Sequence, residues 1–205
     1  MKNRLEISDL SLAYGKRTIL EHISFTLAAG EAVALCGENG SGKTTLLTAA
    51  AGILRPTHGK IRRSGKVGYV PQSAALLEDM TFADNLRYFS AIARARVPQV
   101  LPLCADELRP MRVRDMSGGM KKLCSIVCTL VAAPDILLLD EPYAALDEAH
   151  AAMLTDYLGD FLQNGGSLLI AAHDADEYLP LTSRRLLLTD GSMRKETLTR
   201  AEAPV

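Results

Sequence analysis

The feature that most constrains the fold is a glycine-rich stretch, LCGENGSGKTTLL, which runs from Leu35 to Leu47. It follows an apolar run and leads into a segment with helical character, so it predicts a strand, a tight loop and a helix. Its spacing fits G-x-x-x-x-G-K-[ST] through Gly37, Gly40, Gly42, Lys43 and Thr44. An ordinary glycine-rich turn between the same two elements is the plainer alternative.

The spacing has a chemical reason, which is the binding of a phosphate chain. A loop that wraps phosphate turns several backbone N–H groups inward, and glycine tolerates the positive φ angles that this requires. The N-terminus of the following helix adds a partial positive charge. We expect Lys43 to reach the β- and γ-phosphates, the Thr44 hydroxyl to bind Mg²⁺, and Thr45 to contact the α-phosphate.

Short runs of valine, isoleucine and leucine recur along the chain. Runs that are apolar on both faces indicate strands of a parallel sheet covered by helices, and they begin at Glu31, Lys66, Asp135, Ser167 and Arg184. Residues 1–30 instead alternate in the manner of antiparallel strands joined at a Tyr-Gly-Lys turn. The fold class is therefore α/β: a P-loop NTPase core with a mostly parallel sheet, an N-terminal antiparallel β subdomain and an inserted helical subdomain.

We expect one domain over the whole chain, divided into approximate parts. The parts are antiparallel β at 1–30 and 55–70, a P-loop core at 31–54 and 134–205, and a helical insert at 73–133. Within the insert, Thr81 and Asp84 form a capping box that predicts the start of a helix.

Two carboxylates, Asp140 and Glu141, end the apolar run ILLLDEP. Ligands of open parallel sheets gather beyond the carboxyl ends of the strands, and successive strand residues face opposite ways. We therefore expect Asp140 to address Mg²⁺ through its water shell, and Glu141 to face the γ-phosphate and an attacking water. The plainer alternative is a solvated strand end.

Composition and charge argue against a nucleic-acid-binding protein and a membrane-spanning protein. The formal charge of −1 and the pI of about 6.4 offer no basic face for a nucleic acid. Because no apolar run approaches the roughly 18 residues that cross a bilayer, we expect a cytosolic protein. The cysteines have no C-x-x-C spacing and are expected to be buried thiols, with a metal pair at the last two as the weaker alternative: Cys36, Cys104, Cys124 and Cys128.

In their order and spacing, these motifs resemble those of the ATP-binding-cassette (ABC) transporter ATPases over nearly the whole chain. Gln72 in YVPQS resembles the Q-loop glutamine, MSGGMKK from Met116 resembles the LSGGQ signature, and YAALD ending at Asp147 resembles the D-loop. His173 in AAHD looks like the switch histidine, and Tyr14 occupies the position of the aromatic residue that stacks on adenine. The resemblance implies an enzyme that hydrolyses ATP with Mg²⁺.

The resemblance also implies a role for each residue. The implied catalytic residues are Glu141, His173, Gln72 and Lys43, and the implied metal ligands are Thr44, Gln72 and Asp140. The implied nucleotide contacts are Tyr14, Gly37, Glu38, Asn39, Gly40, Ser41, Gly42, Lys43, Thr44, Thr45, Ser117, Gly118, Gly119 and Asp147. Taken singly, a glutamine before a helix is usually a surface residue, and a histidine after a strand is usually a structural cap.

In the family's arrangement, the signature does not act on the nucleotide of its own chain. Ser117 to Gly119 would begin a helix whose N-terminus is a second anion site, and this site closes over ATP held by a second cassette. We therefore expect a dimer, either of two copies of this chain with an isologous interface or with a paralogue. Met116 and Met120 depart from the usual signature, and Ala144 stands where the D-loop often has a polar residue.

The SGGM form and the stretch MTFADNLRYF are similar to those of exporters of drugs, antibiotics and lipids, so export is favoured over import. A separately encoded permease would hold this chain at the inner face of the cell membrane. The residues that would meet it, unless they only pack in the core, are Leu76, Leu77, Met80 and Phe82. Lys121 and Lys122 are expected on a solvated helix face.

Three other functions stay open at this stage. One is a cassette ATPase of a soluble assembly system, such as iron–sulfur cluster building, and another is the ATPase subunit of a haem exporter. The third is a nucleotide-binding regulator without turnover, which would lack a base or a metal ligand. Since Glu141 and Asp140 are both present, the sequence favours turnover.

Overall fold

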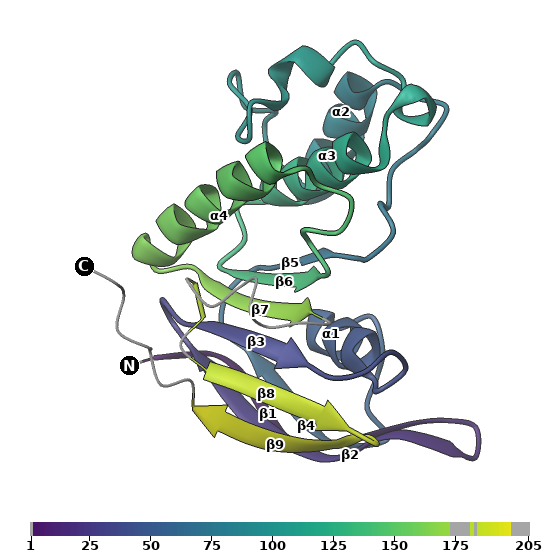
Figure 1. Cartoon of the computed structure of the whole chain (residues 1–205), viewed down its shortest axis with the longest axis vertical. Helices are drawn as coiled ribbons and strands as arrows, with labels where there is room; N and C mark the ends of the chain where they lie inside the picture. The colour runs from purple at the N-terminus through teal and green to yellow at the C-terminus, as the bar shows by residue number, and fades with distance from the viewer. Residues whose placement is uncertain (1, 173–180, 183, 198–205) are drawn as a thin grey trace.

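The fold is built around a six-stranded sheet that has different partners on its two faces (Figure 1). The computed structural model describes residues 2–172, 181–182 and 184–197. The strands lie in the order β5-β6-β7-β3-β8-β9, and all of these pairings are parallel except β8 with β9. Their bounds are β3 (Ala32–Cys36), β5 (Val67–Val70), β6 (Ile136–Asp140), β7 (Ser167–Ala172), β8 (Arg184–Thr189) and β9 (Ser192–Thr197).

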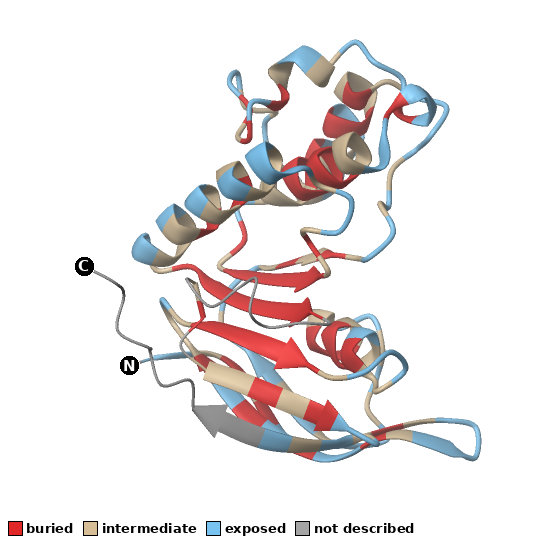
Figure 2. Ribbon diagram, viewed as in Figure 1, coloured by how far each residue is buried: buried red, intermediate tan, exposed pale blue. Residues whose placement is uncertain are grey.

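The central strands are buried on both faces. Every residue of β3, β6 and β7 is buried, as Figure 2 shows in red. This burial explains the continuous apolar runs and confirms the predicted α/β class. The strand β5 pairs in parallel with β6, so residues 67–70 do not belong to the antiparallel part expected over 55–70. The physical reason is the apolar run that begins at Lys66, which pairs in parallel with the fully buried β6, as strands covered on both faces do.

A second, antiparallel sheet has the order β2-β1-β4. It consists of β1 (Asn3–Tyr14), β2 (Arg17–Ala28) and β4 (His58–Arg63). As predicted, β1 and β2 form a hairpin whose turn contains Gly15 with a φ of 59°. From Ile23 to Leu27, alternate residues of β2 are buried and the others are exposed, which is the pattern of a half-covered sheet.

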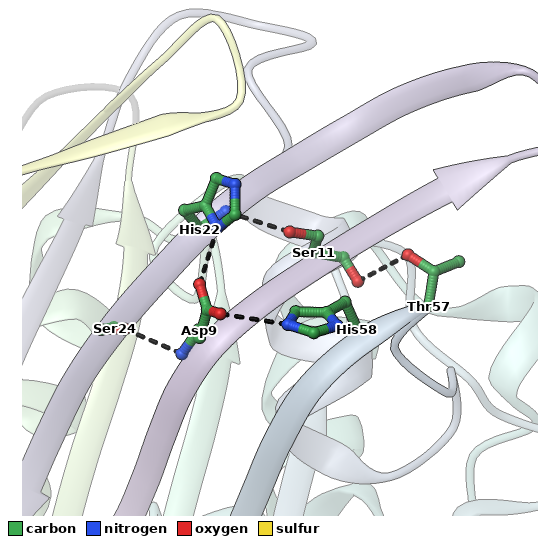
Figure 3. Close-up of polar contacts among 6 residues, drawn as sticks. All are labelled: Asp9, Ser11, His22, Ser24, Thr57 and His58. Carbon is green, nitrogen blue, oxygen red and sulfur yellow. Dashed lines mark hydrogen bonds and ion pairs between the residues drawn. The ribbon is translucent and has the colours of Figure 1, made fainter.

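An exposed polar cluster ties the three antiparallel strands together where β1 is irregular (Figure 3). One carboxylate oxygen of Asp9 contacts His22 Nδ1 at 2.7 Å, and the other contacts His58 Nε2 at 3.1 Å. The backbone N–H of Asp9 donates to the Ser24 hydroxyl at 2.8 Å, and that of His22 donates to the Ser11 hydroxyl at 3.1 Å. Asp9 and His22 both have positive φ angles, of 51° and 52°, so these bonds hold backbone that would otherwise be unfavourable.

The two faces of the six-stranded sheet belong to two different cores. Ile136 and Leu138 face the antiparallel sheet and helix α1 (Lys43–Ala51). Leu137 and Leu139 face the opposite way, into a core with the other helices. Successive residues of one strand therefore serve both cores, as the pleat of a strand requires.

The helical part covers that second face. It consists of α2 (Phe82–Ala93), α3 (Gly118–Leu130), α4 (Glu148–Gln163) and the 3₁₀ turns η1 (Ala105–Leu108) and η2 (Val113–Asp115). The predicted capping box is present, because the Thr81 hydroxyl accepts from the backbone N–H of Asp84 at 3.2 Å. Phe82 is fully buried, so core packing, the alternative left open for it, is the one the structure shows. One expectation is wrong: Cys104 is exposed.

No helix within the described part of the chain is long and apolar enough to span a membrane.

Candidate functional site

The phosphate loop joins β3 to α1 and takes the conformation that its glycines permit. Gly40 and Gly42 have φ angles of 82° and 105°. A Cβ at Gly37 would collide with the backbone oxygen of Leu188, so only glycine fits there. Gly42 is the N-cap of α1 and provides no side-chain cap. The first N–H groups of α1 are therefore left for an anion.

Lys43 lies across this loop rather than in solvent. Its side chain is buried, and Nζ donates to the backbone oxygens of Gly37 at 2.6 Å and Glu38 at 3.1 Å. No ion pair of Lys43 occurs among the described residues. Its hydrogen bonds go to carbonyl groups, and its charge also acts to lower the pKa of the Asp140 carboxyl, which burial raises. A lysine without a carboxylate in direct contact suits a site for phosphate.

The loop is connected to β6 by a short hydrogen bond. The Thr44 hydroxyl donates to Oδ2 of Asp140 at 2.7 Å, and Asp140 is almost completely buried. Burial raises the pKa of the Asp140 carboxyl, and the bond from Thr44 opposes that rise. A hydroxyl and a carboxylate are oxygen ligands of the kind that Mg²⁺ prefers.

The next residue, Glu141, has a different partner. Gln72 Nε2 donates to Oε2 of Glu141 at 2.9 Å. The backbone N–H of Glu141 donates to the backbone oxygen of Ala171 at 2.9 Å, and its φ of +47° is unusual for a residue that is not glycine. A non-glycine residue in this region is strained and is retained where its surroundings fix it.

Lys43, Thr44, Gln72 and Glu141 line one cavity of about 390 Å³. Its walls come from the phosphate loop, the start of α1, the end of β6, the segment after β5 and the first residues of β2. The lining residues are Arg17, Ile19, Asn39, Gly40, Gly42, Lys43, Thr44, Thr45, Gln72 and Glu141. The sequence did not indicate Arg17 or Ile19, and their place after the Tyr-Gly-Lys turn was the one available signal. A neighbouring cavity of about 510 Å³ lies between the same loop and the β8-β9 turn, and it includes Glu38 and Ser41.

Other sequence-predicted residues do not line the 390 Å³ cavity. Tyr14 ends β1 and is half exposed. Ser117 is the N-cap of α3, and its hydroxyl accepts from the N–H of Met120 at 3.2 Å. Asp147 caps α4 by accepting from the N–H of His150 at 2.9 Å. His173 lies outside the described residues.

The two glycines of the signature lie beside the segment that precedes α4. A Cβ at Gly119 would come within 2.6 Å of the backbone oxygen of Ala145, and one at Gly118 would be 3.4 Å from the Ala145 side chain. Gly119 is therefore required by a close backbone approach between the signature and the segment YAALD.

The lysines after the signature differ from each other. Lys121 is partly exposed and forms an ion pair with Glu78 at 2.9 Å. The solvated position expected for Lys122 is wrong, because only 4% of that residue is exposed. Burial lowers the pKa of Lys122, whereas the charges of Asp140 and Glu141 act to raise it.

Comparison with known proteins agrees with this arrangement. The profile of the ABC transporter family matches residues 20–144. A cytochrome c biogenesis ATP-binding export protein, CcmA, of Ruegeria pomeroyi is 36% identical over 82% of this chain and 84% of its own length. A zinc import ATP-binding protein, ZnuC, of Roseobacter denitrificans is 33% identical over 90% of this chain and 74% of its own length.

A solved structure described as the ATP binding subunit of an ABC transporter has the same fold. It superposes with a TM-score of 0.82 and 28% identity, and the match covers 95% of this chain and 90% of that one.

Proposed function

The chain belongs to the ABC transporter family of ATP-hydrolysing cassettes, and we propose that it is the motor subunit of a membrane exporter. The observation that carries the proposal is the pair of contacts at the end of β6. Asp140 binds Thr44 of the phosphate loop, and Glu141 binds Gln72, so two carboxylates beside one loop have separate partners. Phosphoryl transfer to water needs one carboxylate for the metal ion and another for the attacking water, and these two are placed for those separate roles.

The residues of the cavity fit a nucleotide and a hard metal ion. The uncapped start of α1 and Lys43 would bind the phosphates, with Thr45 at the α-phosphate. Thr44, Asp140 and Gln72 would hold Mg²⁺ directly or through water, because Asp140 is bonded to Thr44, and Thr44 and Gln72 line the same cavity. When bound, Mg²⁺ supplies charge neutralisation at the phosphates.

Glu141 is the proposed catalytic carboxylate. It would orient a water molecule and accept its proton, while Gln72 holds the carboxylate through the 2.9 Å bond. His173 is proposed to assist at the same phosphate. Glu38, Asn39 and Ser41 would contact the nucleotide from the loop.

The signature is proposed to serve a second cassette. Ser117 and Gly118 are exposed at the start of α3, and neither lines the cavity of the same chain. A second copy placed head to tail would bring Ser117, Gly118, Gly119 and Asp147 to the bound ATP in both sites at once. Tyr14 is exposed and pairs with Arg17, which lines the cavity, and it would stack on adenine. We propose a homodimer, because one chain carries both half-sites, with a paralogue as the alternative.

The permease is proposed to dock beside α2. Leu77 and Met80 lie on the loop before that helix and are 36% and 47% exposed. Exposed apolar side chains close together often mark a surface for a partner. Asn85 fixes this loop, because its side chain bonds both the N–H and the oxygen of Leu77, at 2.8 and 3.1 Å. Leu76 packs partly against the core. Docking at this surface would place the chain on the inner face of the cell membrane.

Export rather than import is the finer part of the proposal. It is supported by the SGGM form of the signature and by the stretch MTFADNLRYF. The matched relatives include a protein named for export and one named for import, so the direction rests on these two motifs. Transport of radiolabelled candidate solutes into inverted vesicles, with the permease co-expressed, tests it directly: uptake driven by ATP outside the vesicles supports export, and its absence alongside uptake by intact cells contradicts it.

Hydrolysis by the purified chain tests the proposed site. We expect Mg²⁺-dependent ATP hydrolysis that falls by about 100-fold or more in Glu141→Gln, while the variant still binds ATP. Glu107→Gln removes an exposed carboxylate from η1 and is the matched control, with an expected rate equal to wild type. If Glu141→Gln hydrolysed ATP at the wild-type rate, Glu141 would not be the catalytic carboxylate.

A further inference from the structure

Lys122 is a lysine in the interior of the helical part, and its ammonium group has an unusual set of partners. It lies in α3, the helix that Ser117 caps, and only 4% of the residue is exposed. Its Nζ donates to the backbone oxygens of Gln72 at 2.7 Å, Pro71 at 3.2 Å and Asp140 at 3.4 Å. One side chain thus contacts the ends of two different strands.

The match between donors and acceptors is complete. An ammonium group has three N–H donors, and three carbonyl oxygens surround this one. The oxygens of Pro71 and Gln72 come just after β5, and that of Asp140 is at the end of β6. These two strands are adjacent and parallel. No carboxylate of the described residues forms an ion pair with Lys122.

Stability alone does not explain a charge at this place. Taking an ammonium group out of water is costly, and an apolar side chain of similar volume is often tolerated as well or better. The charges of Asp140 and Glu141 offset part of that cost, but the hydrogen bonds of Lys122 go to carbonyl groups of particular peptides. Their identity indicates what the charge is for.

The first of these peptides joins Asp140 to Glu141. Lys122 holds its oxygen, and the N–H of Glu141 on the other side of the same peptide donates to Ala171 at 2.9 Å. The peptide plane is therefore fixed from both sides. Glu141 follows it with a φ of +47°, a conformation that persists only where the surroundings determine it.

The other two peptides flank Gln72. The oxygen of Pro71 belongs to the peptide before Gln72, and the oxygen of Gln72 belongs to the peptide after it. Lys122 holds both, so the Cα of Gln72 is fixed between them. The Gln72 side chain then reaches Oε2 of Glu141 at 2.9 Å.

We propose that Lys122 is a positioning residue that fixes Gln72 and Glu141 to each other and to the signature helix α3. The proposal rests on the function proposed above, in which Glu141 and Gln72 act on the ATP of their own chain and α3 acts on that of the partner. Through Lys122, the placement of α3 on one nucleotide determines the geometry of the carboxylate at the other. Lys122 itself does not line the 390 Å³ cavity.

Steady-state hydrolysis by Lys122→Met tests the proposal. Methionine keeps an unbranched side chain and removes all three donors. Because a small misplacement of a catalytic group lowers kcat more than binding, we expect kcat to fall by about 10- to 100-fold while KM and the Kd for ATP stay within about twofold of wild type. Lys121→Met is the matched control: it changes the neighbouring, partly exposed lysine and its ion pair with Glu78, and its expected kcat equals wild type.

The outcomes separate this proposal from the proposed function. If wild type hydrolyses ATP, Glu141→Gln does not, and Lys122→Met keeps the wild-type kcat, Lys122 has no positioning role and the function stands. If Lys122→Met loses ATP binding together with turnover, its role is structural and the proposal is overturned. If wild type itself does not hydrolyse ATP, the proposed function fails and the role of Lys122 fails with it.

A second variant keeps the test decisive should Lys122→Met not fold. Lys122→Arg retains the charge, but a planar guanidinium directs its N–H groups differently from an ammonium and does not match three carbonyls that converge on one nitrogen. We expect a kcat lowered by about 3- to 10-fold at unchanged KM. A wild-type kcat in Lys122→Arg would show that only the charge is needed and would overturn the positioning role.

Discussion

The helices α1 and α3 both begin at a glycine-containing motif, yet their N-termini are built in opposite ways. The N-cap of α1 is Gly42, which has a φ of 105° and no side chain to accept a hydrogen bond. The N-cap of α3 is Ser117, whose hydroxyl accepts from the N–H of Met120. The first helix leaves its amide groups open, whereas the second satisfies one of them by itself.

Their surroundings differ in the same sense. Leu46 and Leu47 of α1 are completely buried between the two sheets, and the preceding loop is braced by Lys43. Ser117 and Gly118 are exposed at the start of α3. The difference supports the proposal that α1 binds phosphate inside its own chain, and that α3, with an exposed and self-capped start, would complete a site only together with a second chain.

Removing the lysine of the first helix should have the largest effect. Lys43→Ala deletes the cation held against the phosphate loop, and loss of such a group costs about 100-fold or more in turnover. ATP binding to the single chain, measured by titration calorimetry, should weaken as well. Lys16→Ala, in the exposed hairpin turn, is the control and should bind normally; equal binding by Lys43→Ala would remove the basis for the contrast.

A side chain at the cap of α1 should damage the fold itself. In Gly42→Ala the new methyl group would lie 2.8 Å from the Leu20 side chain, at a positive φ. We expect the free energy of unfolding to fall by about 1–3 kcal/mol in urea denaturation. Gly165→Ala is the matched control, since Gly165 also has a positive φ, of 84°, but nothing within 4 Å of its Cβ position. A smaller loss in Gly42→Ala than in Gly165→Ala would contradict the crowding.

Removing the cap of α3 should cost less and should leave single-chain binding intact. Ser117→Ala loses the bond to Met120 and should lower the free energy of unfolding by about 1 kcal/mol. The Kd of the single chain for ATP should stay unchanged, because Ser117 does not line the cavity. Thr81→Ala removes the same kind of bond at the cap of α2 and is the control, with an expected loss of stability of similar size. A tenfold weaker Kd in Ser117→Ala would place Ser117 in the site of its own chain.

Replacing Asp9, in the polar cluster of the antiparallel sheet, should have the smallest effect, and only on stability. Asp9 raises the pKa of His22 through their hydrogen bond, and the same bond lowers the pKa of Asp9. The His22 contribution is present below its unfolded pKa and is lost as the pH rises through the raised value, whereas the Asp9 contribution is lost as the pH falls through its lowered value.

Asp9→Asn should therefore reduce the melting temperature most between about pH 4 and 6.5 and least near pH 9. ATP hydrolysis should not change. A reduction that is equal at pH 5 and pH 9 would show that the cluster stabilises the sheet without charge.

The sequence predicted the parts of the site that a short motif or the end of a buried strand determines. Gly37 to Thr44 occupy a strand-to-helix loop, and Asp140 ends a buried strand beside it, because short-range spacing and strand ends determine these places. The class of the fold followed from the apolar runs. The pairing of β5 with β6 did not, because a run of four residues carries no mark of its partner strand.

Tertiary contacts were beyond the sequence in other places too. Lys122 is polar and follows an exposed cap, yet α3 turns it towards three carbonyl groups that come from distant segments. Core packing was left open for Leu76, Leu77, Met80 and Phe82 alike, and only the tertiary structure separates the buried Phe82 from the exposed Leu77 and Met80. Cys104 is exposed at the N-cap of the 3₁₀ turn η1, and nothing in the sequence marks that turn.

Mixing two inactive variants tests the central claim most directly. Lys43→Ala removes the phosphate site of its own chain, and Ser117→Arg blocks the exposed start of α3. If each site is formed by α1 of one chain and α3 of the other, a mixed dimer has one intact site, and an equimolar mixture should recover about a quarter of the wild-type rate of ATP hydrolysis. If both helices served the same chain, the mixture would stay as inactive as its components, and the account would be wrong.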